Sequence, residues 1–477
     1  MEIDYEKIGF KSGLEIHQQL DSGKLFSRTP SLLRSDEPNY IIKRKLHVVA
    51  GETGEIDIAA EHEAGLDKDF YYQGYNDSIS LVELDEAPPE MINEEALKIA
   101  LHIALLLNCE ILPMSQIMRK TVIDGSNTSG FQRTVLIAKN GFIETSSGKV
   151  KIDTVVLEED SARPVERSET KVVYRLDRLG IPLVEIATAP DLRNPEMVKE
   201  AALHIGDVLR SCRVKRGIGT IRQDVNVSIQ GHPRVEIKGF QDVKMFVPTI
   251  EKEIKRQQAE KKGKAEVRNA KSDGSTEFLR PMPGSARMYP ETDLPILKIS
   301  REIVNEAKRT LPKLRKEVKG ELRESGLSEE MVSLLMKANL LDEFKFLKNL
   351  TGNSDLIVKM LILWKRDFAT KLKKSVNEIE KFLSLDVLEE VLKNLKKKVI
   401  QEHDIQDVLF EIVQGKTLED VLKREKISLD DVESFIRKLV KEKPGLSVGG
   451  YMGIIIKEFK GKISGKEIME ILKKYVK

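Results

Sequence analysis

Alternating apolar and polar positions mark several strands in the first 300 residues. Residues 13–20 (GLEIHQQL), 220–229 (TIRQDVNVSI) and 234–238 (RVEIK) all follow this pattern. Successive side chains of a strand point to opposite faces, so each run predicts a strand with one apolar and one polar face. Asn140-Gly141 and Ser147-Gly148 are typical turn dipeptides, and they predict tight turns in an antiparallel meander between about residues 134 and 157.

Helical periodicity replaces this alternation after about residue 300. Residues 331–350 and 386–399 place apolar side chains three and four positions apart, and 15 of the 17 prolines lie at or before Pro295. Proline interrupts helices, so its scarcity in the remainder agrees with a helical fold. Within the first part, Asn194-Pro195 predicts the start of a helix that runs to about Leu209. The chain is therefore predicted to be α+β, with a sheet-rich domain (1–297), a helical domain (298–410) and a small helical tail (411–477).

Composition narrows the function classes. The 79 Lys and Arg residues nearly balance 77 Asp and Glu residues, so no general basic field of the kind expected of a nucleic-acid-binding protein is present. No run of about 18 uncharged apolar residues is present, so no membrane span is expected. Two cysteines exclude a disulfide framework and a four-cysteine zinc site. With a charged N-terminus unlike a secretory signal, these features predict a cytoplasmic protein.

The polar faces of the predicted strands are unusually acidic. Glu15 and His17 share one face, Glu185 interrupts the apolar run 183–187, and Asp224 and Glu236 lie on the polar faces of later strands. The ordinary alternative is an antiparallel sheet with one solvated face. However, several carboxylates gathered on one face repel each other unless cations lie among them. Divalent cations with nucleotide phosphates would supply that charge, so the pattern predicts a metal–phosphate site.

The motifs of the chain resemble one family. They are GLEIHQQL (13–20), DGSNTSGFQRT (124–134), LEEDSARP (157–164), YRLDRLGIPLVEIATAPD (174–191), GTIRQDVNVSI (219–229), VEIKG (235–239) and FLRPMPGSARMYPETD (278–293). Together they resemble the GatB/GatE family, the kinase and tRNA-binding subunits of tRNA-dependent amidotransferases. Two of them, DGSNTSGFQRT and RPMPGSARMYPETD, resemble the archaeal GatE branch rather than the bacterial GatB branch. The resemblance implies a glutamine-synthetase-like antiparallel-sheet cradle domain, an all-helical domain and a YqeY-like helical tail.

The resemblance also implies a reaction and its residues. ATP would phosphorylate the γ-carboxylate of glutamate mischarged on tRNA(Gln), and ammonia would then displace phosphate to give Gln-tRNA(Gln). The implied cofactors are ATP and Mg²⁺. The metal ligands would be Glu15, His17, Glu159 and Glu236, although Glu159 falls on the apolar face of Val155 and Leu157 in the alternation pattern.

Further residues belong to the same predicted site. Asp224 is a further catalytic candidate. Glu185 is a candidate for the nucleotide site. The basic Arg222, Arg175 and Lys120 are candidates as well, because two negatively charged reactants must be brought together there. For Arg175 and Lys120 an ordinary surface ion pair is the alternative.

No amidase or asparaginase signature is present, so the resemblance implies a partner, the asparaginase-like amidase subunit GatD, with Glu-tRNA(Gln) as substrate. The alternatives are a GatB-type subunit working with a Ser-amidase and a non-catalytic tRNA-binding module. Ser27 and Thr29 stand where many members have zinc-binding cysteines, so no zinc is expected. Only a Lys-rich stretch near 255–275 stands where GatE proteins usually carry an insertion resembling an aspartyl-tRNA synthetase. In the tail, the segment 450–472 resembles the family tail and is predicted to bind the body of the tRNA through its lysines.

Overall fold

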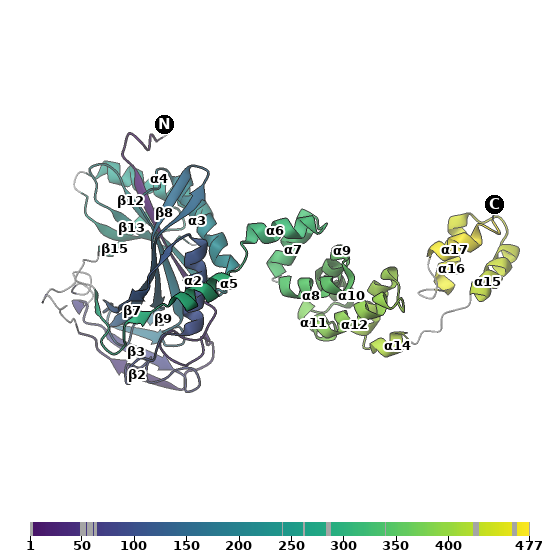
Figure 1. Cartoon of the computed structure of the whole chain (residues 1–477), viewed down its shortest axis with the longest axis horizontal. Coiled ribbons are helices and arrows are strands. Elements are labelled where there is room, and N and C mark those ends of the chain that lie inside the picture. Colours follow the sequence, from purple (N-terminus) through teal and green to yellow (C-terminus); the bar gives the residue numbers. More distant parts are fainter. Residues whose placement is uncertain are drawn as a thin grey trace. The chain divides into compact units, whose positions relative to one another are not determined.

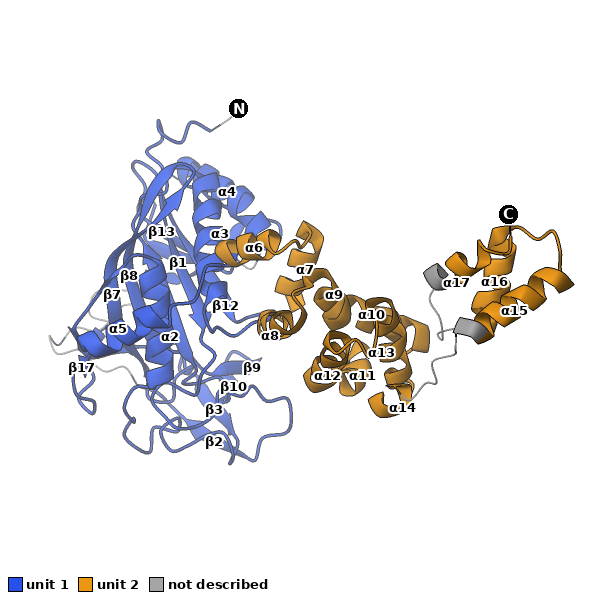
Figure 2. Cartoon of the chain, turned by 45° about the vertical axis from the view of Figure 1, so that its right-hand side comes forward, with its two compact units in different colours: residues 1–315 blue, residues 316–477 orange. Residues whose placement is uncertain are grey.

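The computed structural model describes residues 3–47, 54, 61, 64–240, 242–260, 263–282, 288–338, 340–422, 429–459 and 465–476, without the side chains of 429–430 and 465–467. The chain divides into two compact units, Met1–Arg315 and Lys316–Lys477, which Figure 2 colours separately. The first unit is mixed α/β and the second is helical (Figure 1).

One large sheet dominates the first unit. Its eleven strands follow the order β15-β14-β13-β12-β1-β11-β8-β7-β6-β16, with β4 paired to β7. All neighbouring strands are antiparallel except β13 and β14. The strands are β1 (Lys11–Gln19), β4 (Glu110–Ile111), β6 (Ile117–Thr121), β7 (Phe131–Thr145), β8 (Gly148–Glu159), β11 (Pro182–Thr188), β12 (Ile221–Ser228), β13 (Val235–Lys238), β14 (Glu266–Ala270), β15 (Thr276–Pro281) and β16 (Met288–Pro290).

Two smaller sheets complete the strands of this unit. A four-stranded sheet has the order β2-β3-β10-β9, and a two-stranded sheet pairs β17 with β5. Their bounds are β2 (Tyr40–Arg44), β3 (Asp69–Gly74), β5 (Met114–Ser115), β9 (Arg163–Arg167), β10 (Lys171–Arg175) and β17 (Leu297–Lys298). The four-stranded sheet has an aromatic core of its own, in which the rings of Tyr72 and Tyr174 stack at 6.2 Å.

Helices cover the apolar side of the large sheet and leave its polar side open. They are α2 (Glu94–Leu106), α3 (Pro195–Ser211), the short η1 (Val243–Met245), α4 (Phe246–Ala259) and α5 (Arg301–Arg309). Helix α3 packs on β1 and β7, α2 on β7 and β8, and α4 on β12. Leu14 and Ile16 of β1 are fully buried in this core, so the alternate residues Glu15 and His17 point to the opposite face.

The second unit consists of helices in the residues that the structure describes. They are α6 (Arg315–Glu324), α7 (Glu329–Ala338), α8 (Leu341–Thr351), α9 (Ser354–Val358), η3 (Lys359–Leu363), α10 (Trp364–Leu372), α11 (Val376–Phe382), α12 (Leu385–Lys396), η4 (Glu402–Asp404), α13 (Ile405–Val413), α14 (Leu418–Leu422), α15 (Leu429–Glu442), α16 (Val448–Glu458) and α17 (Gly465–Leu472). One apolar cluster runs from Val318 to Val421, and a separate one joins α15, α16 and α17. Within the described ranges, no helix combines the length and apolar character needed to cross a bilayer.

The predicted α+β class is confirmed, with a large sheet followed by a helical region. The helix predicted at Asn194-Pro195 is α3, whose first turn is capped by the Asn194 side chain accepting from the Met197 backbone N–H. The boundary of the first compact unit falls after Arg315, since α5 packs against α2. The division at residues 297 and 410, the cradle description and the YqeY-like tail stay predictions.

The turn predicted at Asn140-Gly141 is wrong. Strand β7 runs through both residues, and Gly141 pairs with Ile152 of β8. Asn140 has a φ of 55°, and the next residue must be small because a Cβ on Gly141 would lie 2.3 Å from the Cys109 Sγ atom. Gly141 therefore lets the long strand β7 pass close to Cys109. The chain reverses at the second predicted turn, beside Gly148.

Candidate active site

The register of the strands gathers polar residues on the open face of the large sheet. His17 of β1 lies opposite Glu185 of β11 on one side and Arg222 of β12 on the other. Glu15 lies opposite Asp224, and Glu236 of β13 lies opposite Asn226. Directly opposed residues of antiparallel strands project to the same face, so side chains from distant parts of the sequence meet here.

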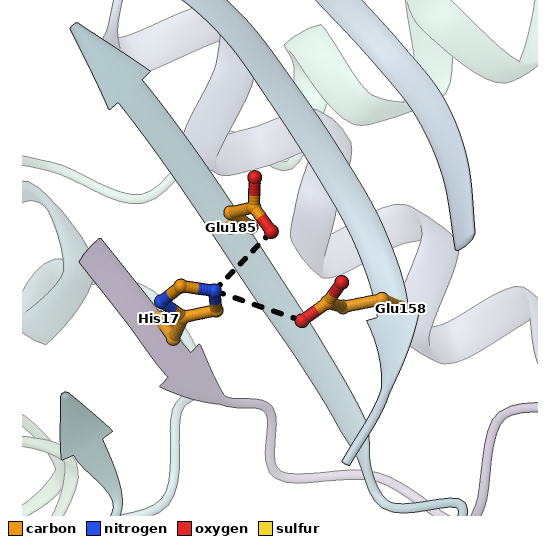
Figure 3. Close-up of side chains that lie close together, drawn as sticks. All are labelled: His17, Glu158 and Glu185. Atoms are coloured by element: carbon orange, nitrogen blue, oxygen red, sulfur yellow. Dashed lines mark hydrogen bonds and ion pairs between the residues drawn. The ribbon is translucent and has the colours of Figure 1, made fainter. Parts of the chain in front are cut away.

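The first cluster joins His17, Glu158 and Glu185 (Figure 3). The His17 Nε2 atom lies 3.2 Å from Glu185 Oε2 and 3.7 Å from Glu158 Oε1. Lys120 of β6 adds a cation, with its Nζ atom 2.5 Å from Glu158 and 3.6 Å from Glu185. Two carboxylates thus share one lysine and one imidazole on the polar face of the sheet.

Electrostatics in this cluster favour the charged forms. Burial alone would raise the pKa of Glu185, but Lys120 and the hydrogen bond with His17 hold that pKa well below its ordinary value. Burial alone would lower the pKa of His17, yet Glu185, and after it Glu158 and Asp224, raise the His17 pKa above its ordinary value. Lys120 and the protonated His17 ring are therefore the two cations that balance the two carboxylates of this cluster.

The second cluster joins Glu15, Asp224 and Glu236, whose carboxylate oxygens lie within 4.8 Å of one another. Lys238 Nζ is 2.6 Å from both Asp224 and Glu236. Burial, followed by the charges of Glu236 and Glu185, raises the pKa of Glu15. Despite burial, Asp224 and Glu236 raise the pKa of Lys238. Lys238 is the cation that contacts two of these three carboxylates, and the ionised form of Glu15 is the one that an added cation would stabilise.

Arg222 lies on the same face and is held by Asp160. Its NH2 atom is 2.8 Å from Asp160 Oδ1, and Gln19 donates to the other oxygen of that carboxylate at 2.6 Å. Asp160 is only 1% exposed, whereas the Arg222 side chain is 40% exposed. The guanidinium is therefore fixed at its inner edge and open to a ligand at its outer edge.

Glu159 lies outside both clusters. Its Oε2 atom accepts from the Arg133 backbone N–H at 3.3 Å, and the Arg133 side chain lies 3.4 Å from the same oxygen. With Ser27 and Glu83, these residues line a small polar pocket beside Gly180. The carboxylate beside His17 is that of Glu158, one residue earlier. A role of Glu159 as a metal ligand stays a prediction.

Arg175 also lies apart from the clusters. It is the last residue of β10 in the four-stranded sheet, where its Nε donates to the Gln73 side chain at 2.9 Å and its NH1 to the Arg34 carbonyl at 3.1 Å. The structure thus brings together Glu15, His17, Lys120, Glu185, Arg222, Asp224 and Glu236, and it sets Glu159 and Arg175 elsewhere.

The sequence analysis did not name three residues of the polar face as candidate site residues: Glu158, Asp160 and Lys238, of which Lys238 lies on the polar face of the predicted strand 234–238. Glu158 could have been found, because it alternates with Leu157, which is fully buried on the apolar side. Lys238 could have been found in the same way, as it follows Glu236 by two positions on β13. Asp160 lies just beyond the end of β8, where alternation gives no signal.

The all-oxygen donor set of the second cluster suits Mg²⁺. This ion prefers carboxylate oxygen ligands and keeps several waters, so a face that offers convergent carboxylates within 4.8 Å is appropriate for it. Glu15, Asp224 and Glu236 are oxygen donors throughout, whereas the first cluster adds the His17 nitrogen. The residues present therefore fit the ion, and Lys120, Lys238 and Arg222 lie beside them as partners for phosphate.

Comparison with known proteins gives one consistent result. The family model described as the GatB/GatE catalytic domain matches residues 10–305. The E subunit of glutamyl-tRNA(Gln) amidotransferase from Methanocaldococcus jannaschii is 35% identical over the full length of both chains. Proteins with the same name from Methanothermobacter thermautotrophicus (34% identical, 92% of this chain and 93% of the relative) and Sulfurisphaera tokodaii (31%, full length of both) are also similar.

The domain that carries the acidic sheet face matches a family of catalytic domains, and the chain belongs to the GatB/GatE family. This confirms the resemblance drawn from the motifs. The alignment with the first relative spans 638 positions although the chain has 477 residues, so that relative carries segments that have no counterpart here.

The His17 environment predicts a pH dependence. In metal-free protein, the His17 pKa should lie above 6.5, and Glu185→Gln should lower it because the hydrogen bond and charge of Glu185 are removed. The stabilisation from the raised pKa is present below pH about 6.5 and is lost as pH rises through the folded-state value. NMR titration of the His17 ring measures the pKa in the wild-type protein and in Glu185→Gln, and the His17→Gln variant assigns the signal. The exposed Glu144→Gln is the control, and a wild-type value below 6.5 contradicts the prediction.

Proposed function

We propose that this chain is the ATP-using subunit of a tRNA-dependent amidotransferase that converts Glu-tRNA(Gln) into Gln-tRNA(Gln). The γ-phosphoryl group of ATP passes to the γ-carboxylate of the glutamyl residue, giving an acyl phosphate and ADP. Ammonia then attacks the carbonyl carbon, the C–O bond to phosphate breaks, and phosphate and a proton leave. The observation that supports this most is the pair of carboxylate clusters with adjacent lysines on one open sheet face.

Each part of the polar face has a role in this reaction. Two negatively charged reactants must approach each other, and the carboxylates of Glu15, Asp224 and Glu236 would hold Mg²⁺, which would supply charge neutralisation for the phosphates. Lys120 and Arg222 lie on the same face and contact anions there, which suits the screening of a phosphoryl group. Gln19 and Asp160 fix the Arg222 guanidinium, so little side-chain entropy is lost when it meets a ligand.

The chain needs a source of ammonia, and we propose an asparaginase-like amidase subunit, GatD, as its partner. The names of the relatives support a partner subunit, because all three are E subunits of glutamyl-tRNA(Gln) amidotransferase, and the motif resemblance implies that this partner is GatD. Recovery of a Ser-amidase with the native protein would favour the GatB-type alternative.

The isolated chain should phosphorylate without transferring an amide from glutamine. With ATP, Mg²⁺ and Glu-tRNA(Gln), it should release ADP but form no Gln-tRNA(Gln), since its own residues offer no amidase site. Added ammonium salt should restore Gln-tRNA(Gln), measured by chromatography of the released amino acid. Ammonia release from glutamine by the purified polypeptide would contradict this division of labour.

Two adjacent glutamates provide a matched test of the site. Glu158→Gln should lower the phosphorylation rate of the folded protein by about 10–100-fold, because it removes a carboxylate beside His17 and Lys120. Glu158 is itself buried and paired with Lys120, so thermal unfolding of this variant is measured alongside its rate. Glu159→Gln should instead lower the midpoint of thermal unfolding, since it breaks the buried pair with Arg133. Glu144→Gln, exposed on the β7–β8 hairpin, is the neutral control. If Glu159→Gln abolishes phosphorylation at unchanged stability, Glu159 is the ligand, as the family resemblance implies.

We further propose that the tail binds the body of the tRNA. Lys457 is exposed on α16, while Lys460 and Lys462, which the motif resemblance also implicates, lie outside the described residues, as does the side chain of Lys466. The tail has its own apolar core, formed by residues such as Val432, so its helices do not depend on the preceding cluster for burial.

Deleting residues 423–477 should test the tail without damage to the rest. The cut follows Val421, the last member of the preceding apolar cluster, so that cluster stays whole. tRNA binding should weaken and its salt dependence should flatten, because lysine–phosphate contacts are lost. Phosphorylation at saturating Glu-tRNA(Gln) should persist. A truncated chain that binds tRNA with the affinity and salt slope of the full chain would show that these lysines are only solvated surface.

A further inference from the structure

A basic loop projects at the end of the sheet where His17 and Arg222 lie. It spans residues 212–220, between the end of α3 at Ser211 and the start of β12 at Ile221. Arg222, which faces His17, follows Thr220 by two residues, or about 7 Å of extended chain. The loop is thus next to the reaction face, and none of the residues assigned to the reaction lies within it.

The base of this loop is firmly attached to β1. Gln18, only 4% exposed, donates from its side-chain amide to the carbonyls of Lys215 at 2.9 Å and Thr220 at 3.1 Å. The backbone N–H of Lys215 donates to the Gln19 carbonyl, and that of Gln19 to the Thr220 carbonyl, both at 2.9 Å. One buried glutamine therefore closes both ends of the loop and fixes its position relative to His17.

The tip of the loop is open on all sides. Ile218 is 104% exposed, the highest value among the exposed large apolar side chains of the described residues. Its neighbours Gly217 and Gly219 have φ values of +121° and +84°, and a Cβ on either would meet nothing within 4 Å. An isoleucine held out into solvent on a fixed base has no role in the fold of this unit, which suggests a contact with another molecule.

Arginines gather at the base of the loop, beside the end of α3. Arg216 donates to the carbonyl of Arg210 at 3.3 Å, and the backbone N–H of Arg315 donates to the Ser211 hydroxyl at 3.0 Å. Burial, followed by the charges of Arg216 and Arg210, lowers the pKa of Arg315. Among the described residues, neither Arg216 nor Arg315 forms an ion pair with a carboxylate within 4.0 Å. These cations repel each other, and a bound anion would relieve that repulsion.

Carboxylates nearby offset only part of this charge. Arg210 pairs with Asp207 at 2.8 Å, and Arg213 pairs with Glu95 at 2.5 Å. Lys215 donates to the Ser31 carbonyl and is half-buried. The excess positive charge is thus concentrated on Arg216 and Arg315.

We propose that this loop, with Arg216, Ile218 and Arg315, is a docking site for the acceptor end of the tRNA, and this inference rests on the proposed function. Phosphates of the acceptor strand pair with the two arginines, while Ile218 packs on a ribose or on the face of a terminal base. A polyanion bound at this loop lies near Arg222, because Thr220 precedes Arg222 by two residues and Gln18 fixes the loop to the strand that carries His17. The combination of unpaired arginines and one projecting apolar side chain suits nucleic acid, which offers phosphates beside apolar sugar and base faces.

The test measures binding of unacylated tRNA(Gln) transcript to the full chain over a range of salt concentrations. Arg216→Ala with Arg315→Ala should weaken binding by about 10-fold or more and reduce the slope of log K against log salt by about 2. Ile218→Ala should weaken binding without changing the slope, since it removes no charge. Lys149→Ala with Lys151→Ala, at the far end of β8 from Glu158, removes the same charge and should change neither quantity.

Stability and partner controls separate the outcomes. Thermal unfolding shows whether Arg315→Ala destabilises the fold. If it does, Arg216→Ala is tested alone, and the expected change in the salt slope is about 1. If the wild-type chain binds tRNA and the double variant binds it equally well with the same slope, the inference is wrong and the proposed function stands. If the double variant keeps tRNA but loses its amidase partner, the loop is a protein interface. If the wild-type chain neither binds tRNA nor forms Gln-tRNA(Gln) with ammonium, the proposed function itself fails.

Discussion

The structure depends on the balance of like charges on one face of an antiparallel sheet. Glu15, Asp224 and Glu236 bring their oxygens within 4.8 Å of one another, and Lys238 alone bridges two of them. Such a group is costly to hold together, since repulsion and partial burial both oppose ionisation. Burial and this repulsion raise the pKa of Glu15, and a divalent cation bound among the carboxylates would relieve the repulsion.

Rigid packing behind the sheet makes this arrangement stable. Leu14 and Ile16 are fully buried under α3, so β1 cannot turn its acidic residues away from the polar face without exposing its apolar ones. The antiparallel register then fixes which side chains meet, and it places His17 between Glu185 and Arg222. Apolar burial on one side of the sheet therefore supports the charge concentrated on the other.

The cations on and near this face differ in how closely carboxylates pair with them. Lys120 and Lys238 lie among the carboxylates, Arg222 is held by Asp160, and Arg216 lies on the loop 212–220, where it donates to the Arg210 carbonyl at the end of α3. The first two are matched to carboxylates at short distance, whereas the last has no carboxylate within 4.0 Å in the described part of the chain. Such a gradient would draw an anionic substrate from the loop toward the centre of the sheet.

The sequence by itself determined the fold class, the helix at Asn194-Pro195 and most of the acidic face, because period-two alternation is a local property of each strand. It also determined the family, through long motifs. Alternation along β8 already separates Glu158 from the apolar face of Val155 and Leu157. Only the tertiary structure decided that Glu158 lies 3.7 Å from His17, and that Arg175 belongs to another sheet. It alone showed that the Asn140-Gly141 pair continues a strand. The reason is that strand register, strand ends and contacts between distant segments arise from packing across the sheet, which no local pattern encodes.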